Sequence, residues 1–180
     1  MVTEDVIVRT AGPADATGIA AVYAPVVEQT VISFEETAPD ADELARRMLA
    51  RPRLPWLVGE LRGRVVGFAY ASQHRQRAAY RWSADCSIYL DAGARGKGLG
   101  RALYERLFAE VRELGYVSLF AGVALPNEAS VGLHEALGFT PVGVYRQVGH
   151  KQGAWIDVGW WQLALREAPP QPAEPVESVL

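Results

Sequence analysis

Hydrophobic positions along the chain follow two periods, one typical of strands and one typical of helices. Apolar residues that recur three and four positions apart predict a helix after Asp15, a second after Asp40, a third over 99–114 and a short fourth after Asn127. Short apolar or alternating runs predict strands at 6–9, 30–34, 56–61, 65–71, 83–90, 116–125, 141–148 and 154–165. Strands and helices are therefore interspersed along the chain.

Capping and breaking residues support these boundaries. Asp40 followed by Glu43 has the spacing of a capping box, and Asn127 is a suitable N-cap for the short helix. Gly115 directly follows the third helix, where a C′ glycine is expected. Pro25 falls late in the first helix, so we expect it to kink or end that helix.

The connections between the strands predict the fold class. The segment 62–64 contains glycine and is short enough to join two antiparallel strands, and 150–153 does the same for the last two. A parallel crossover lies between them, through the helix at 99–114. We expect one α/β (α+β) domain over 1–167, with a mixed, mostly antiparallel sheet flanked by helices, and a disordered tail rich in proline and glutamate over 168–180.

Composition narrows the class of partner and cofactor. The 180 residues are 49% hydrophobic, which suits one core, and the net charge of −3 argues against nucleic acid as a partner. An acidic N-terminus and the lack of a run of about 20 apolar residues predict a cytoplasmic protein away from membranes. Cys86 is the single cysteine, and His74, His134 and His150 lack metal-ligand spacing, so no metal is expected.

A glycine-rich turn stands between the strand at 83–90 and the helix that follows it. Its sequence is Arg95-Gly96-Lys97-Gly98-Leu99-Gly100-Arg101. Glycines leave backbone N–H groups free to face an oxyanion at a helix N-terminus, and three basic side chains add charge. A magnesium-binding Walker loop is excluded because Gly98 follows Lys97, and a dinucleotide fold fits poorly because the next strand ends without an acidic residue. The turn therefore predicts a phosphate-bearing cofactor.

Four ordered motifs carry a resemblance to a known family. They are 79–90, the glycine turn, 125–139 and 149–158, and together they resemble the phosphinothricin N-acetyltransferase branch of the GNAT superfamily over nearly the whole chain up to about residue 165. The resemblance implies the GNAT fold, acetyl-CoA as donor and a homodimer with sites near the subunit interface. It implies, as acceptor, the α-amine of a small amino acid such as phosphinothricin, methionine sulfoximine or methionine sulfone. Family members with these motifs often confer antibiotic or herbicide resistance.

The resemblance also carries site residues onto this chain. Substrate-binding positions would be Phe34, Arg75, Gln76, Arg77, Asp85, Cys86 and Ser87. Cofactor-binding positions would be Ile88, Tyr89, Leu90, Arg95, Gly96, Lys97, Gly98, Leu99, Gly100, Arg101, Asn127 and Ser130. The arginines suit bidentate recognition of a carboxylate or phosphinate.

Asp85 and His134 are the catalytic candidates. Acetylation of an amine needs a base for the ammonium and an acid for the departing thiolate. Asp85 shares a strand face with Ser87 and Tyr89, although it could instead only order the arginine-rich loop before it. The family usually has glutamate there, so the shorter aspartate would act through water or give weaker activity on phosphinothricin. His134 shares a helix face with Asn127 and Ser130 and could protonate a thiolate or relay a proton, whereas a lone helical histidine is usually structural.

Other functions remain open at this point. A GNAT enzyme could act on another small amine such as a polyamine, but the segment 72–81 is cationic, and a polyamine calls for an acidic site. A protein N-terminus would need an open peptide groove, which the sequence does not reveal. A protein that binds acyl-CoA as a sensor could have kept the glycine turn and lost catalysis.

Overall fold

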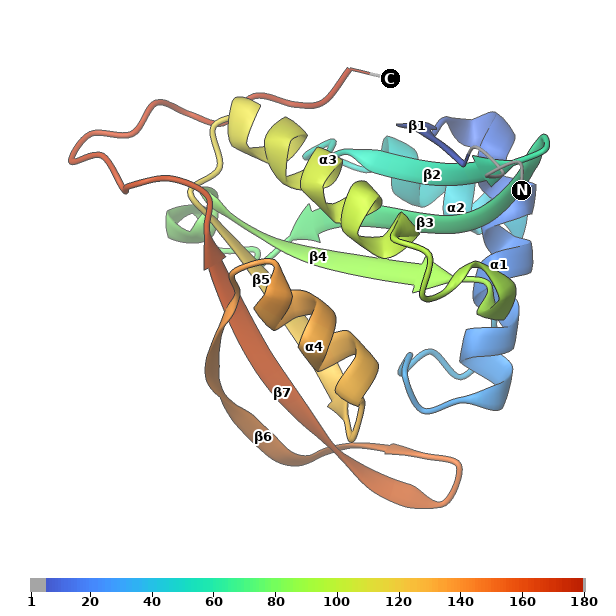
Figure 1. The fold of residues 1–180 in the computed structure, drawn as a ribbon. Coiled ribbons are helices and arrows are strands. Elements are labelled where there is room, and N and C mark those ends of the chain that lie inside the picture. The colour runs from blue at the N-terminus through green and yellow to red at the C-terminus, as the bar shows by residue number, and fades with distance from the viewer. Residues whose placement is uncertain (1–5, 180) are drawn as a thin grey trace.

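The computed structural model describes residues 6–179, which form one seven-stranded mixed sheet flanked by helices (Figure 1). The strand order is β1-β2-β3-β4-β5-β7-β6, and every neighbouring pair is antiparallel except β4 and β5. The strands are β1 Ile7–Thr10, β2 Trp56–Leu61, β3 Arg64–Gln73, β4 Ser83–Leu90, β5 Ser118–Leu125, β6 Thr140–Lys151 and β7 Ala154–Ala164. The predicted fold class is confirmed.

Helices cover both faces of the sheet. They are α1 Ala16–Gln29, α2 Ala41–Leu49, α3 Leu99–Glu113 and α4 Glu128–Ala136, and the short 3₁₀ turns are η1 Pro13–Asp15, η2 Ala78–Tyr80 and η3 Ala92–Ala94. Leu103, Leu107 and Val111 of α3 are fully buried against one face of the sheet. Ile19 and Val27 of α1 are fully buried in a second core on the other face, which α2 also covers. The sheet therefore separates two hydrophobic layers.

The predicted N-cap side chains are present at the start of the second and fourth helices, although the Glu43 carboxylate bonds Arg47 and does not complete the expected capping box. Asp40 accepts a hydrogen bond from the Glu43 backbone N–H at 2.8 Å. Asn127 accepts one from the Ser130 N–H at 3.2 Å. Each cap satisfies a backbone donor that the first helical turn leaves free.

Two sequence predictions near the first helix need correction: Pro25 does not end the helix, and residues 30–34 do not form a strand. Helix α1 continues past Pro25 to Gln29, since Pro25 lies on its exposed side, where water can solvate the carbonyl that proline leaves without a partner. Residues 30–34 are irregular rather than a strand. Ser33 is buried there, with its hydroxyl 2.7 Å from the Tyr23 hydroxyl, so this segment packs through side chains and pairs with no strand.

Strands β4 and β5 pair for only a short distance. Their parallel register joins residues 83–85 to residues 118–120. Beyond that point β4 continues against β3 as far as Leu90, and β5 continues against β7 as far as Leu125. The two strands splay apart (Figure 1), so the backbone edges of 86–90 and 121–125 lack strand partners on the sides that face each other.

The C-terminal residues 167–179 run past the far end of α3 without forming a helix or strand (Figure 1). The Val176 N–H donates to the carbonyl of Leu114, and the Trp82 indole N–H donates to the carbonyl of Ala173, each at 2.8 Å. No residue of this described segment is buried. Among residues 6–179, no helix combines the length and hydrophobicity needed to cross a membrane.

Candidate functional site

The glycine turn leads from β4 into α3 through two left-handed backbone positions. Gly96 has a φ of 70° and Gly98, the N-cap of α3, a φ of 84°, where residues with a Cβ are strained. Leu99 then inserts its side chain against β2 and β3, where a Cβ at Gly59 would lie 2.6 Å from the Leu99 Cδ1. The lack of a side chain at Gly59 therefore lets the N-terminus of α3 approach the sheet closely.

A cavity of about 530 Å³, here called the cofactor cavity, lies along this turn. It brings together most of the predicted cofactor-binding positions. Its walls are Val26, Ile32, Ile88, Tyr89, Leu90, Arg95, Gly96, Gly98, Gly100, Arg101, Asn127, Ala129, Ser130 and Leu133. Lys97 and Leu99 are not among them: the Lys97 side chain is exposed, and Leu99 belongs to the core.

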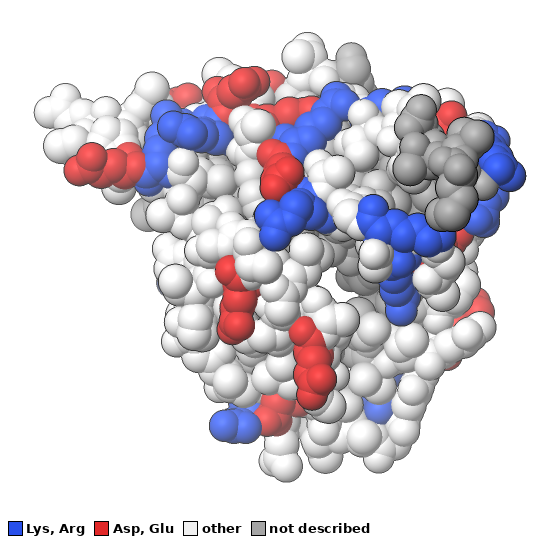
Figure 2. All heavy atoms as spheres, in the orientation of Figure 1, with Lys and Arg blue, Asp and Glu red and all other residues white. Residues whose placement is uncertain are grey.

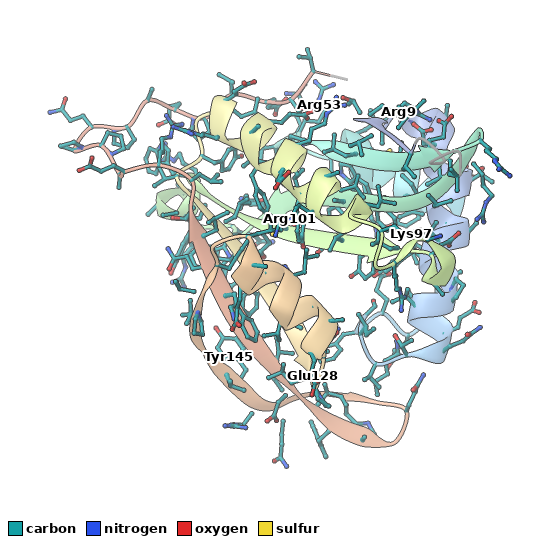
Figure 3. The ribbon with its side chains drawn as sticks, in the orientation of Figure 1. Arg9, Arg53, Lys97, Arg101, Glu128 and Tyr145 are labelled. Atoms are coloured by element: carbon teal, nitrogen blue, oxygen red, sulfur yellow. The ribbon has the colours of Figure 1, made fainter. Side chains whose placement is uncertain are left out.

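Basic side chains flank this region on the surface. Figure 2 shows blue side chains on either side of a hollow in the middle of the face, where Figure 3 labels Arg101 and Lys97. Arg101 also donates to the carbonyl of Ala136 at 3.3 Å and so bridges α3 and α4. The turn thus combines a helix N-terminus with cationic side chains, which suits an anionic ligand.

A narrow cleft of about 50 Å³ continues from the cofactor cavity between the splayed strands. Its lining includes 86–89 of β4 and 122–124 of β5, together with Tyr104 and His134. It shares Ile88, Tyr89 and Ser130 with the cofactor cavity. The opening between β4 and β5 therefore extends the cofactor cavity into the sheet.

At the other end of the cleft lies a cavity of about 420 Å³, here called the acceptor cavity. Its walls are Ile32, Phe34, Ser72, Asp85, Cys86, Ser87, Gly122, Ala124, Tyr145, Val148, Val158 and Trp160. Asp85 is the one carboxylate among these residues. Phe34, Cys86 and Ser87 also lie where the sequence predicted substrate contacts, whereas Arg75, Gln76 and Arg77 are exposed and do not line this cavity.

Asp85 has a partner that the sequence analysis missed. The His74 Nδ1 lies 2.6 Å from the Asp85 Oδ1, and the imidazole stacks on Phe120 with ring centroids 4.3 Å apart. Burial raises the pKa of Asp85, while the His74 hydrogen bond and the charges of His74 and Arg75 act in the opposite direction. The sequence analysis found no metal-ligand spacing for His74 and gave it no other role, because its contact with Asp85 depends on the register that pairs Ser72 with Asp85.

Arg75 lines a third cavity, of about 510 Å³, here called the outer cavity. Its guanidinium lies 5.7 Å from the centre of the Trp160 ring. His74, Tyr80, Phe120, Val142, Gly143, Val144, Tyr145 and Trp160 complete its walls. Tyr145 and Trp160 also line the acceptor cavity, so the two cavities are neighbours.

His134 is buried, with 3% of its surface exposed, and both ring nitrogens are engaged. Nδ1 lies 2.7 Å from the Ser130 carbonyl, which can only accept, so this nitrogen carries the proton. Nε2 lies 3.0 Å from the Tyr104 hydroxyl and accepts from it. Burial lowers the pKa of His134, so the neutral imidazole is favoured. Tyr104 was not predicted for the site, since it lies next to the apolar stripe of α3.

Comparison with known proteins gives consistent results. A family described as an acetyltransferase (GNAT) domain matches residues 8–160. A phosphinothricin N-acetyltransferase of Streptomyces viridochromogenes is 37% identical over 96% of this chain and 95% of its own length. An L-methionine sulfoximine/L-methionine sulfone acetyltransferase of Salmonella typhimurium is 36% identical over 89% of this chain and 95% of its own.

A solved structure extends the likeness to the fold. The phosphinothricin acetyltransferase of Sinorhizobium meliloti, crystallised in complex with acetyl-CoA, aligns with a TM-score of 0.88 and 37% sequence identity. The alignment covers 95% of each chain. The similarity thus spans the glycine turn, the cleft and the acceptor cavity.

Proposed function

The chain belongs to the GNAT acetyltransferase family, and from this premise we propose that it transfers the acetyl group of acetyl-CoA to the α-amine of a small amino acid. The acceptor class is that of phosphinothricin, methionine sulfoximine and methionine sulfone, which the names of its relatives give. One observation carries the proposal: a continuous lining runs from the glycine turn, between β4 and β5, to the carboxylate of Asp85.

The residues along the cofactor cavity fit acetyl-CoA. Backbone N–H groups of the glycine turn and the charges of Arg95 and Arg101 would hold the pyrophosphate, because the positive φ of Gly96 and Gly98 allows that backbone conformation. The unpaired edge of β4 at residues 88–90 would bond the pantetheine arm as an added strand would. Acetyl-CoA supplies the activated thioester.

Asp85 would accept a proton from the acceptor ammonium, directly or through one water. Its partial burial moves its pKa upward, toward the working pH, which suits a general base. Phe34 and Trp160 would form apolar walls for the side chain of the acceptor. Arg75 lies over Trp160, which also lines the acceptor cavity, and would contribute positive charge for an acceptor carboxylate.

His134 would handle the proton that the leaving sulfur needs. It lines the cleft in its neutral form, and Nε2 is the nitrogen with a lone pair. Because Nε2 accepts from the Tyr104 hydroxyl, the second amine proton would pass through that hydroxyl, which gives its own proton to Nε2 as it takes one up, and the reverse transfer would protonate the thiolate. Together, two protons leave the ammonium: one through Asp85 to solvent and one to the sulfur.

We also propose that the protein works as a cytoplasmic homodimer that detoxifies such amino acids. Large apolar side chains are exposed along the β6–β7 hairpin, among them Val142, Val148 and Trp155, at 59%, 51% and 62%. Figure 2 shows few charged side chains on the part of this face where α4 and the hairpin lie. Because Tyr145 and Val148 also line the acceptor cavity, a second copy docked here would lie beside the site.

Thiol release from acetyl-CoA by the purified protein tests the function. Methionine sulfoximine, methionine sulfone, phosphinothricin, spermidine and a short peptide are offered in parallel. We expect saturable release with the first three. Release only with spermidine or the peptide would instead indicate another GNAT acceptor class. No release despite tight acetyl-CoA binding would indicate a sensor.

A further inference from the structure

The hydrogen bond between His74 and Asp85 joins two cavities. Asp85 lines the acceptor cavity, whereas His74 lines the outer cavity. The side chain of Asp85 is 24% exposed and that of His74 is 10% exposed. Their 2.6 Å contact joins the residue that follows β3 to the neighbouring strand β4. A histidine therefore stands behind the proposed base, on the side away from the acceptor.

The imidazole is held in place on several sides. It stacks on Phe120 at 4.3 Å and meets the edges of Tyr80 at 5.8 Å and Trp160 at 6.3 Å, measured between ring centroids. This aromatic enclosure restricts the ring to an orientation in which Nδ1 meets Asp85. The contact is therefore built into the packing and does not depend on a mobile surface side chain.

The carboxylate oxygens of Asp85 have different surroundings. Oδ1 is bonded to His74, and among the described residues Oδ2 has no hydrogen-bond partner. Because an ionised carboxylate only accepts, Nδ1 of His74 must donate to Oδ1. The His74 side chain also lines the outer cavity. Oδ2 is thus the oxygen available to the acceptor amine.

We propose that His74 is a positioning residue for Asp85, whose Nδ1–H bond to Oδ1 fixes the short acid with Oδ2 free for the acceptor and favours its ionised, base-competent form. This inference rests on the proposed function. It assigns a role to a histidine on β3's C-terminal side, and it explains how an aspartate can serve at this position. Charge-assisted bonds of this kind both orient a carboxylate and stabilise its charge.

Removal of His74 should change the pH dependence of catalysis. Arg75, Tyr80, Tyr70, Cys86 and Tyr145 also surround the pair. Burial raises the pKa of Cys86 to about 12 and raises that of Tyr70, so neither group explains an acidic limb. Without the His74 bond, burial of Asp85 is less opposed, so its pKa rises and the acidic limb of kcat/KM moves to higher pH.

Two variants separate the hydrogen bond from the ring. His74→Phe keeps an aromatic ring on Phe120 and removes the donor, whereas His74→Asn places an amide donor near the position of Nδ1. At pH 7 we expect His74→Phe to lower kcat by about 10- to 100-fold, the scale expected from misplacement of a catalytic group. The KM for acetyl-CoA should stay unchanged, and His74→Asn should recover part of kcat.

The experiment combines two measurements. The first is kcat/KM against pH, with whichever offered amine the wild type acetylates, so that a wrong acceptor class leaves the comparison intact. The second is the ¹³C carboxyl titration of Asp85 by NMR, assigned with Asp85→Asn, which needs no turnover. An upward shift of the Asp85 midpoint in His74→Phe, smaller in His74→Asn, supports the proposal. Midpoints that match the wild type overturn it, even if the enzyme is active, and an inactive wild type overturns only the proposed function.

Discussion

The ring of Phe34 lies directly over the backbone of Gly149, where an added Cβ would stand 2.2 Å from the Phe34 Cε2. Phe34 lies in the irregular segment after α1, and Gly149 lies in β6. One wall of the acceptor cavity is therefore held by the β6–β7 hairpin, and the shape of that wall depends on the absence of a side chain at 149.

Gly149→Ala should displace Phe34 and weaken acceptor recognition. Because Phe34 is 42% exposed, its ring can move outward without unfolding the domain. We expect kcat/KM for the acceptor to fall by about tenfold, the scale of a change in one apolar contact, with acetyl-CoA affinity unchanged. Steady-state kinetics measures this. Gly143→Ala is the control because nothing lies within 4 Å of its added Cβ, and an equal loss in both variants would contradict the account.

Lys151 of the β6–β7 hairpin binds the backbone of α1 and of the irregular segment that follows it. Its ammonium donates to the carbonyls of Val27 at 2.6 Å and Ser33 at 2.7 Å. Lys151→Met leaves both carbonyls without this donor, so we expect the free energy of unfolding to fall by about 1–2 kcal/mol. Urea denaturation measures it. The same substitution at Lys97, an exposed lysine without such carbonyl contacts, should leave stability nearly unchanged; an equal effect at both positions would argue against the contact.

The backbone at Gly98 should be essential to the cofactor cavity. Gly98→Ala places a Cβ at a φ of 84°, and the left-handed conformation costs about 1–2 kcal/mol for such a residue. The turn can relieve this strain by changing shape, so we expect weaker acetyl-CoA binding by calorimetry. Gly93→Ala lies just before the turn, with open space around its Cβ, and should bind like the wild type. Unchanged affinity in Gly98→Ala would show that the turn does not hold the cofactor.

His134 should make stability depend on pH. Its ordinary pKa is 6.5, and burial lowers that value in the folded state. As pH falls below about 6.5, the unfolded chain takes up a proton that the folded chain resists, so stability decreases until the folded pKa is also passed. Urea denaturation at a series of pH values should show this slope in the wild type. His134→Asn should show a smaller slope, and equal slopes would exclude His134 as the cause.

Much of the fold could be predicted because its signals are local. The glycines before α3, the Asp40 and Asn127 caps and the alternation of the strands each depend on residues close in sequence. The strand prediction for 30–34 is wrong because Ile32 and Phe34 are apolar residues that line a cavity and do not belong to a strand. Apolar composition alone does not distinguish these roles.

Most of the residues that the sequence assigned to the site come from consecutive runs, and the family resemblance added single positions such as Phe34, Asn127 and His134. The glycine turn and residues 85–90 form such runs, and the structure places most of them along the cofactor and acceptor cavities. The contacts of His74 with Asp85 and of Tyr104 with His134 join residues of different elements. These contacts depend on strand register and on how α3 and α4 pack. Neither can be read from the sequence, because the paired residues are 11 and 30 positions apart.

The most direct test of the account is whether the acceptor itself gains an acetyl group at its α-amine. Wild type and Asp85→Asn are incubated with acetyl-CoA and methionine sulfone, and the products are identified by mass spectrometry and NMR. We predict N-acetylmethionine sulfone from the wild type and at least about a 100-fold lower rate from Asp85→Asn, as expected when a general base is lost, with acetyl-CoA binding preserved in both. Equal rates in the two proteins would contradict the role of Asp85, and no acetylated amino acid from the wild type would contradict the proposed function.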